Sequence, residues 1–264
     1  MEVRAKKALG QHFLTDRSIA KSIVDSLIVE AQKEGQEKEE VLEIGPGMGV
    51  LTSYLLERQE LALKLVEIDG ESVEYLLSHF PDMEGRLMQE DFLKMRLDKI
   101  FDKNFSIIGN FPYNISSQIF FKILDNKDKI PQVVCMIQKE VAERIAEKPG
   151  TKTYGILSVL LQAWYDIEYL FTVGSGAFAP PPKVQSAVIR LRRNGRKSLG
   201  VDESLFKAVV KTSFNQRRKT LRNSLKPMLN LAVAGTASDP VFDLRPERLS
   251  VEDFIDLTKK FEAK

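Results

Sequence analysis

The 264-residue sequence predicts an α/β fold: a doubly wound, mostly parallel sheet followed by a small all-helical domain. Three observations predict this fold. Short apolar runs typical of buried strands alternate with segments whose apolar residues recur at helical spacing. A glycine-rich turn joins an early strand to a helix, and the pattern becomes wholly helical after Arg193. Strands that alternate with helices form a parallel sheet that is covered on both faces.

The elements are expected in the following order. Thr15 or Asp16 caps the first helix, whose apolar positions include Ile19 and Ile23, and a polar connector follows at 32–40. Strands are predicted at 41–44, 63–68, 86–89, 105–108, 133–137, 167–173 and 184–191. Helices are predicted at 50–58, around 76–80, and at 115–124, 139–147 and 156–164. The last two strands have no helix between them, so we expect them to pair antiparallel at an edge of the sheet.

The change to a helical pattern places a domain boundary between residues 193 and 194. We expect a sheet domain at 1–193 and a helical domain at 194–264, joined by a connector at 194–200. A long helix is predicted over 203–225, with or without a break near Asn215.

Composition and charge narrow the class of protein. Hydrophobic residues make up 43% of the chain and charged residues 29%, which is typical of a soluble folded protein. No apolar run approaches the ~20 residues that span a bilayer. The single cysteine, Cys135, excludes an internal disulfide and fits a reducing compartment, so a cytoplasmic location is expected.

The charge is uneven, although the net charge is only +2. Thirteen Lys and Arg residues lie between Lys183 and Lys226 against two acidic residues, and the first twenty-two residues carry five basic and two acidic groups. Two basic regions in an otherwise acidic chain can attract a polyanion. A solvated basic face is the alternative.

The glycine turn predicts a nucleoside site. Gly45, Gly47 and Gly49 join a strand to a helix, where glycine lets the backbone approach a ligand closely. Glu67 ends the next strand, at the position where a carboxylate accepts both ribose hydroxyl hydrogens. The G-x-G-x-G spacing favours S-adenosylmethionine over NAD, since there is no pyrophosphate to hold. Asp91 ends the third strand and either accepts from the adenine amine or caps the next segment.

The segment Asn110-Phe111-Pro112-Tyr113 follows the fourth strand, at the edge of the sheet where ligands bind. An adenine N6 amine is a weak nucleophile because its lone pair is delocalised. Two acceptors that hold its N–H groups, the Asn110 side-chain oxygen and the Phe111 carbonyl, can turn that lone pair toward an electrophile. Pro112 stiffens the turn, and the Tyr113 ring offers a stacking surface worth ~1–3 kcal/mol.

Four motifs together resemble the ribosomal RNA adenine N6-dimethyltransferase family, of the bacterial KsgA (RsmA) type, from Lys6 to about Lys226. They are Leu9-Gly10-Gln11-His12-Phe13-Leu14, residues 43–52, residues 110–116, and Phe178-Ala179-Pro180-Pro181-Pro182-Lys183-Val184 with Ser186-Ala187-Val188. The resemblance implies a Rossmann-like class I methyltransferase sheet with S-adenosylmethionine as cofactor.

The resemblance also implies roles for individual residues. The cofactor-binding residues would be Gln11, His12, Leu14, Gly45, Gly47, Gly49, Glu67, Ile68, Asp91, Phe92 and Asn110. His12 stands where the family often has Asn. Phe178 would come close to the target base, opposite Tyr113; without the resemblance it is a core aromatic that anchors a loop.

The basic stretch near the end predicts RNA binding. On a continuous helix, Lys207, Lys211, Arg218 and Arg222 would share one face, flanked by Arg217 and Lys219. Cations on one face suit the phosphates of A-form RNA. Arg217 has an alternative role, the anchoring of one domain to the other.

The site residues predict an S-adenosylmethionine-dependent adenine N6-methyltransferase, and the resemblance implies that it dimethylates N6 of two adjacent adenines in the 3′-terminal hairpin of 16S ribosomal RNA. The small ribosomal subunit is its expected partner, without a membrane, and the chain is expected to be a monomer that needs no metal. The alternatives are a large-subunit RNA or DNA N6-adenine methyltransferase and a non-catalytic ribosome-assembly factor.

Overall fold

The computed structural model describes residues 3–29, 37–231 and 238–262. Most of the expected connector at 32–40 lies outside these residues. The chain divides into two compact units, which we call the sheet unit (1–142 with 167–193) and the helical unit (143–166 with 194–264). The expected division assigned 143–166 to the first domain. The structure groups this segment with the second because α6 (Ile156–Gln162) packs on α7 (Glu203–Asn215) and α9 (Val251–Lys259).

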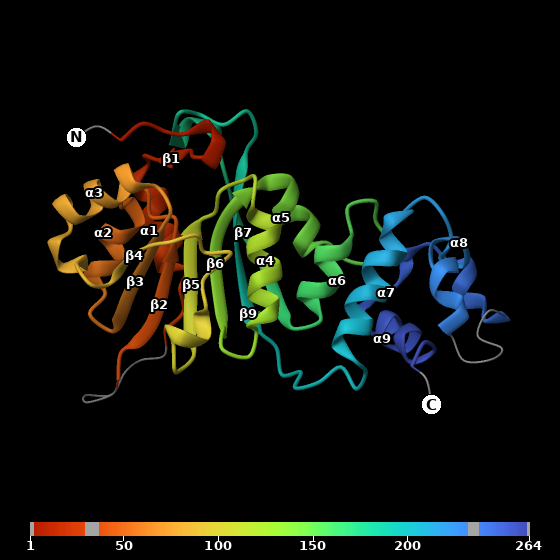
Figure 1. Cartoon of the computed structure of the whole chain (residues 1–264). Coiled ribbons are helices and arrows are strands. Elements are labelled where there is room, and N and C mark those ends of the chain that lie inside the picture. Colours follow the sequence, from red (N-terminus) through yellow and green to blue (C-terminus); the bar gives the residue numbers. More distant parts are fainter. Residues whose placement is uncertain (1–2, 30–36, 232–237, 263–264) are drawn as a thin grey trace. The chain divides into compact units, whose positions relative to one another are not determined.

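A seven-stranded sheet runs through the described part of the sheet unit in the order β4-β3-β2-β5-β6-β9-β7 (Figure 1). Its strands are β2 (Glu39–Ile44), β3 (Leu61–Glu67), β4 (Leu87–Gln89), β5 (Phe105–Asn110), β6 (Gln132–Gln138), β7 (Tyr165–Val173) and β9 (Ser186–Arg193). The strands from β4 to β6 are parallel, and β9 pairs antiparallel with β6. As expected, the last two long strands are neighbours at an edge.

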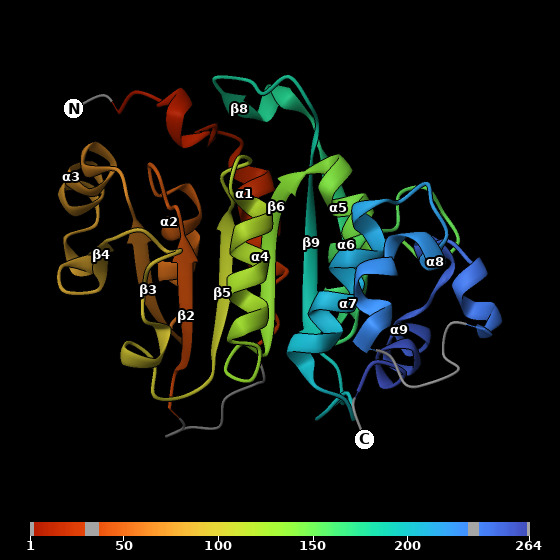
Figure 2. The same cartoon turned by 45° about the vertical axis from the view of Figure 1, so that its right-hand side comes forward.

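Helices cover both faces of this sheet, with α4 in front of it and α1 behind it in Figure 2. The helices of the sheet unit are α1 (Arg17–Asp25), α2 (Val50–Glu57), α3 (Gly70–His79) and α4 (Ser116–Asp125). A further helix, α5 (Lys139–Ala146), follows β6 and spans the division between the two units. Of the two expected caps, Asp16 begins α1, because its carboxylate accepts from the backbone N–H groups of Ser18 and Ile19.

The strand residues alternate between the two faces. Val41, Ile108 and Val134 belong to a core cluster with Ile23 of α1 and Leu51 of α2. Their chain neighbours point the other way, since successive side chains in a strand face opposite sides. Both sets are buried, which is why the strands appear in the sequence as continuous apolar runs.

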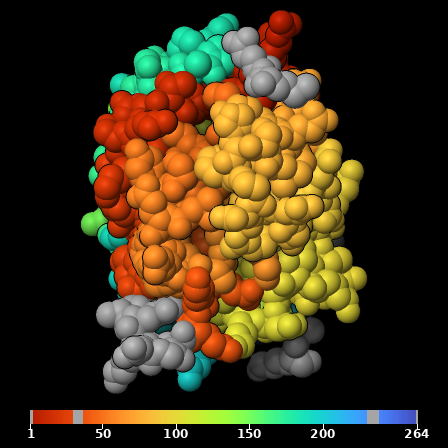
Figure 3. Space-filling view, turned by 90° about the vertical axis from the view of Figure 1, so that its left-hand side faces the viewer, coloured from red at the N-terminus to blue at the C-terminus, as the bar shows by residue number. Residues whose placement is uncertain are grey.

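A second, two-stranded sheet was not expected from the sequence. β1 (Phe13–Leu14) pairs antiparallel with β8 (Phe178–Ala179). In the space-filling view, the red N-terminal segment lies against the blue-green segment that contains β8 (Figure 3). Two segments of two residues each, about 165 positions apart, have no pattern that predicts their pairing.

The helical unit is built around α6, α7 and α9, with the short helix α8 (Leu221–Ser224) after α7. Phe214 and Phe254 pack with ring centroids 5.9 Å apart, and Phe206 of α7 is also buried. Among the described residues of both units, short 3-10 turns also occur at Lys7–Leu9, Pro81–Met83, Leu97–Lys99, Ser175–Ala177, Lys226–Leu231, Pro240–Asp243 and Pro246–Arg248.

The long helix over 203–225 is broken. α7 ends at Asn215, the Lys219 N–H donates to the Gln216 carbonyl at 2.7 Å, and Thr220 begins α8 in an extended conformation. No proline or glycine causes this break. The contacts of the 216–220 turn with other parts of the helical unit, described below, hold the chain out of the helix.

Candidate active site

A cavity lies at the carboxyl ends of β2, β3 and β5. β2 has β3 on one side and β5 on the other, and open α/β sheets bind ligands at such a reversal of strand order. The N-terminal segment and the loops after these strands form the wall. The predicted site residues in the wall are Gln11, His12, Leu14, Gly45, Gly47, Glu67, Ile68, Asp91, Phe92, Asn110, Phe111, Pro112 and Tyr113.

The glycine turn after β2 requires glycine at two wall positions. Gly45 and Gly47 have φ angles of 65° and 56°, in the left-handed region that favours glycine. The Gly45 N–H donates to the Val66 carbonyl at 3.0 Å, which ties the turn to the end of β3. A Cβ on Gly47 would lie 2.9 Å from the Phe13 ring, so the N-terminal segment packs directly on this turn.

Gly49, the third glycine of the predicted cofactor set, is not among the residues that line the cavity. It begins α2 with a φ of 76°, and a Cβ there would overlap the Phe80 ring and approach Leu76. The glycine is therefore needed for the close packing of the α2 start against the end of α3.

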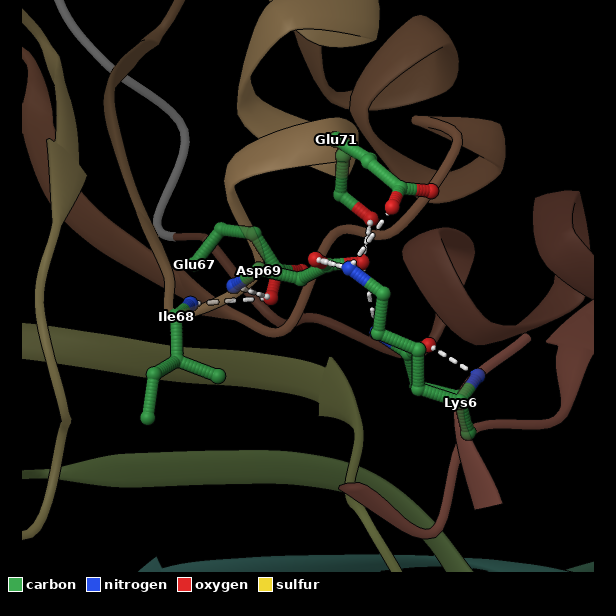
Figure 4. Close-up of polar contacts among 7 residues, drawn as sticks. Lys6, Glu67, Ile68, Asp69 and Glu71 are labelled. Atoms are coloured by element: carbon green, nitrogen blue, oxygen red, sulfur yellow. Dashed lines mark hydrogen bonds and ion pairs between the residues drawn. The ribbon is translucent and has the colours of Figure 1, made fainter. Parts of the chain in front are cut away.

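Glu67 ends β3 with its carboxylate held by three backbone N–H groups. One oxygen accepts from Gly47 at 3.1 Å. The other accepts from Ile68 at 2.8 Å and Asp69 at 2.9 Å (Figure 4). Burial raises the pKa of Glu67, and these hydrogen bonds only partly oppose that effect. The carboxylate is thus fixed at the cavity wall, where it can accept hydroxyl hydrogens from a ribose.

Glu43 is a wall residue that the sequence reasoning missed. Its side chain is 1% exposed and accepts a hydrogen bond from the Thr52 hydroxyl at 2.7 Å. Burial raises the pKa of Glu43 to about 8, and the nearby Glu67 carboxylate acts in the same direction. The available signal was one acidic residue at a buried position of the Val41–Ile44 run.

Asn110 is the last residue of β5, and its carboxamide is oriented by the protein. The Nδ2 group donates to the His12 carbonyl at 2.9 Å. Among the described residues, no hydrogen bond uses the Asn110 side-chain oxygen or the Phe111 carbonyl. The Phe111 ring is buried and its N–H donates to the Met136 carbonyl at 3.0 Å, which fixes the backbone at this point. Two acceptors therefore remain available at the cavity wall.

Tyr113 and His12 lie together at this wall. Their ring centroids are 5.4 Å apart with the planes tilted by 31°. The Tyr113 hydroxyl bonds to the Ser186 hydroxyl, and His12 Nδ1 is 2.9 Å from the Pro180 carbonyl. Burial raises the pKa of Tyr113. The phenol is thus neutral at physiological pH and held in place, which suits a stacking surface rather than a base.

Asp91, Phe92 and Ile68 complete the predicted wall. The Asp91 carboxylate accepts from the Leu93 N–H at 3.0 Å and lies 3.6 Å from the Lys94 ammonium. The structure therefore contains the local capping bond that the sequence left as an alternative, at a residue that also lines the cavity. Phe92 and Ile68 supply apolar side chains to the cavity wall. Phe92 is buried, whereas Ile68 is 50% exposed.

Phe178, predicted to come close to the target base, is not among the residues that line the cavity. It pairs with Leu14 and is 4% exposed within the core cluster that contains Leu14, Val173 and Val188. The structure therefore corresponds to the alternative interpretation of this residue as a core aromatic that anchors a loop.

The basic residues of the helical unit do not form one helical stripe. Lys207 and Lys211 lie on α7, Arg217, Arg218 and Lys219 lie in the turn after it, and Arg222 lies on α8. The Arg217 guanidinium donates to the backbone carbonyls of residues 151, 152 and 154. Arg222 pairs with Asp243 at 2.7 Å. Arg218 and Lys219 are exposed. Arg217 thus anchors a loop within its own unit.

Other chemistry is sparse in the part of the chain that the structure describes. No group of three or more His, Cys, Asp and Glu side chains there is arranged to hold a metal ion. None of the helices described is long and apolar enough to cross a membrane. Cys135 is fully buried in β6, and burial raises the pKa of its thiol, as expected for an inert core residue.

Comparison with known proteins places the sequence among RNA-modifying enzymes. The chain matches the family model for "Ribosomal RNA adenine dimethylase" over residues 2–261. A protein of Parabacteroides distasonis, named Ribosomal RNA small subunit methyltransferase A, is 62% identical over 97% of this chain and 93% of its own length. A protein of the same name from Cytophaga hutchinsonii is 56% identical over 100% of this chain and 99% of its own length.

Solved structures share the fold. A dimethyladenosine transferase from Plasmodium falciparum aligns with a TM-score of 0.76 at 23% identity, over 93% of this chain and 96% of that chain. The 23S rRNA methyltransferase ErmE aligns with a TM-score of 0.64 at 25% identity, over 94% of this chain and 99% of that chain. The predicted Rossmann-like class I sheet is thereby confirmed.

Proposed function

Because the chain belongs to the ribosomal RNA adenine dimethylase family, we propose that it dimethylates N6 of two adjacent adenines in the 3′-terminal hairpin of 16S ribosomal RNA. The observation that carries the proposal is Asn110. Its amide nitrogen is occupied by the His12 carbonyl, so its oxygen is the atom left to receive a hydrogen from the substrate.

The wall of the cavity fits S-adenosylmethionine. The Glu67 carboxylate is fixed where it can bind ribose hydroxyls, and Asp91 has acceptor capacity left for the adenine amine. Gly45 and Gly47 allow the backbone to approach the ligand, while Ile68 and Phe92 supply apolar contact. Bound here, S-adenosylmethionine supplies a methyl group that its sulfonium already activates.

The protein's part in the reaction is positioning. The Asn110 side-chain oxygen and the Phe111 carbonyl accept the two N6 hydrogens and turn the nitrogen lone pair toward the methyl group. Tyr113 stacks on the base, and Pro112 keeps the turn rigid. Orientation of this kind can supply ~7–11 kcal/mol of the barrier. Asn110 is not a base, so the ammonium formed on the product nitrogen loses its proton to water.

The second methylation constrains the same acceptors. After the first transfer only one N–H remains, so one of the two oxygens must lie beside a methyl group. Because the Asn110 amide is held by its nitrogen, its oxygen can keep the remaining hydrogen, and the methyl group then lies on the side of the Phe111 carbonyl.

The RNA contacts belong to the basic residues of the helical unit. We assign phosphate binding to Lys207, Lys211, Arg218, Lys219 and Arg222, and the anchoring role to Arg217. The chain acts as a cytoplasmic monomer on the small ribosomal subunit and its 16S RNA. Relatives named for that subunit, 56–62% identical over nearly the whole chain, support this substrate over large-subunit RNA or DNA.

The test is transfer of a radiolabelled methyl group to unmethylated small subunits, large subunits, naked 16S RNA and adenine-containing DNA. We expect small subunits to be the best acceptor and the product to be dimethyladenosine. Asn110→Ala should lower transfer by about 10²–10³-fold, as loss of one preorganised polar contact does, and should keep cofactor binding within a few-fold.

Asn126→Ala is the matched control, because Asn126 ends α4 with its amide bonded to the Lys122 carbonyl and does not line the cavity. It should transfer methyl groups at the wild-type rate. Equal labelling of all four acceptors would contradict the assigned substrate. Absence of labelling with intact subunit binding would instead indicate an assembly factor without catalytic activity.

A further inference from the structure

The N-terminal segment is part of the cavity wall through six consecutive residues, Leu9 to Leu14. We call residues 6–14 the strap. At one end the strap is held by backbone pairing, since β1 pairs with β8 and the Thr15 N–H donates to the Ala177 carbonyl at 2.8 Å. In its middle, the His12 carbonyl accepts from Asn110. The other end depends on side chains.

Two side chains hold that end to the start of α3 (Figure 4). The Lys6 ammonium binds the Asp69 carboxylate and lies 3.1 Å from Glu71. The Gln11 amide accepts from the Lys6 backbone N–H at 2.8 Å and donates to Asp69 at 3.3 Å. Lys6 and Gln11 thus form a closed loop that converges on one carboxylate.

Asp69 is built for this role. Its side chain is 2% exposed, whereas that of Lys6 is 39% exposed. Burial acts to raise the pKa of Asp69, but the hydrogen bonds from Lys6, Gln11 and Ser72 outweigh it and hold the pKa below the usual value. A buried carboxylate that stays ionised needs its partners, so opening the strap would leave Asp69 poorly compensated.

The same residue also holds the ribose-binding group. The Asp69 backbone N–H donates to the Glu67 carboxylate at 2.9 Å, two residues away in the turn after β3. Asp69 therefore connects the strap, through its side chain, with the position of Glu67, through its backbone. A movement of the strap end would therefore also move the Glu67 carboxylate, which lines the cavity.

We propose that Lys6, Gln11 and Asp69 form a latch that closes the strap over the cofactor cavity and positions Glu67. The proposal rests on the proposed function, because it takes the cavity as the cofactor site. The latch residues are positioning residues: they set how tightly and for how long the cofactor is held, and they take no part in methyl transfer.

The test measures binding of S-adenosylhomocysteine to the whole chain by calorimetry and its release by stopped-flow. Lys6→Met and Asp69→Asn should each raise Kd about tenfold, mainly through faster release. The double variant should lose little more than either single variant, because both remove one interaction. Lys6→Arg, which retains the cation, should keep Kd within about threefold.

Two further readouts separate a latch from a general effect on folding. Hydrogen exchange should increase in residues 6–14 of Lys6→Met and stay unchanged in the strands of the sheet. The KM for the cofactor should rise while kcat at saturating cofactor stays within about twofold. Lys21→Met is the matched control, because it removes an exposed ion pair with Asp25 on α1, outside the cavity; its Kd should equal that of the wild type.

The outcomes distinguish the two proposals. If the wild-type protein does not bind S-adenosylhomocysteine, the cofactor site itself is wrong and the latch with it. If the wild type binds and Lys6→Met and Asp69→Asn bind with the same Kd and release rate, the latch alone is overturned. Should Asp69→Asn fail to fold, Lys6→Met carries the same test from the more exposed partner of the latch.

Discussion

The cavity of the sheet unit and the basic segment at 203–226 are both conspicuous in the sequence, but they differ in what holds their residues. At the cavity, backbone groups hold the functional side chains: three N–H groups bind the Glu67 carboxylate, and the His12 carbonyl binds the Asn110 amide. In the basic segment, side-chain contacts hold the cations, and the partners of those contacts could not be identified from the sequence. Arg217 binds three carbonyls, and Arg222 binds Asp243.

The two regions also differ in what they contribute to stability. The cavity wall contains two buried carboxylates, Glu43 and Glu67, whose burial costs stability. The basic segment contributes stability where its cations bond within the helical unit. The ligand cavity thus lowers the stability of the folded protein. Part of the basic surface that was expected to bind RNA instead raises that stability.

The largest expected effect is at Glu43. Its folded-state pKa of about 8 lies above the unfolded value of 4.5, so the folded protein holds an extra proton between these values. Stability conferred by the protonated group is therefore lost as pH rises from 4.5 to 8. Since one pKa unit is worth about 1.4 kcal/mol, Glu43→Gln should stabilise the protein by roughly 3–5 kcal/mol at pH 8.5 and by little at pH 4.5.

Urea unfolding of the cofactor-free protein across this pH range measures the difference. The Gln side chain can still accept from the Thr52 hydroxyl, so the comparison isolates the titration. A stability difference that is independent of pH would show that Glu43 does not titrate in this range.

The next effect separates the glycines. Gly49→Ala should destabilise by about 2–4 kcal/mol, because the added Cβ meets the Phe80 ring at a left-handed position. Gly85→Ala is the matched control, since its φ is also 76° and nothing lies near a Cβ there; it should lose only about 1–2 kcal/mol. Thermal unfolding measures the stability of both variants. Equal losses of stability would show that packing against Phe80 is not the reason for glycine at position 49.

A smaller effect tests the anchoring arginine. Arg217→Ala leaves three backbone carbonyls without their charged donor, so we expect a loss of about 1.5–3 kcal/mol in unfolding free energy. Arg217→Lys should recover only part of it, because one ammonium cannot reproduce the planar guanidinium. If Arg217→Ala were as stable as the wild type, Arg217 would have no anchoring role and would instead be assigned to RNA binding.

The smallest effect on stability is expected at the neighbouring Arg218, which is exposed. Arg218→Ala should change the unfolding free energy by less than about 0.5 kcal/mol. If Arg218 contacts a phosphate, the variant should weaken RNA binding and reduce the slope of log K against log salt by about 1. Filter binding at several salt concentrations measures it, and an unchanged slope would place Arg218 outside the interface.

Much of the sheet unit could be predicted from the sequence. The parallel strands, the glycine turn, Glu67 at the end of β3 and Asn110 at the end of β5 follow from apolar runs and from turn chemistry within a few residues. The parallel arrangement then brings those strand ends to one edge, so the meeting of Gly45, Glu67, Asp91 and Asn110 at the cavity could be anticipated.

Other features could not be predicted because they depend on contacts between distant segments. The pairing of β1 with β8 holds Phe178 beside Leu14, and the packing of Phe80 requires glycine at position 49. The burial of Glu43 depends on the packing of α2 on β2, where Thr52 of α2 donates to its carboxylate. None of these contacts leaves a period or a spacing in the sequence.

The sequence by itself determined the order of the strands and helices, the glycine turn and the chemistry available at the strand ends, because these depend on near neighbours. Only the tertiary structure decided where the long helix breaks, which cations bind within the protein and how Lys6 and Gln11 meet Asp69. The physical reason is that a long side chain takes the partner that compensates its charge and hydrogen bonds best, and that partner is present only once the chain has folded.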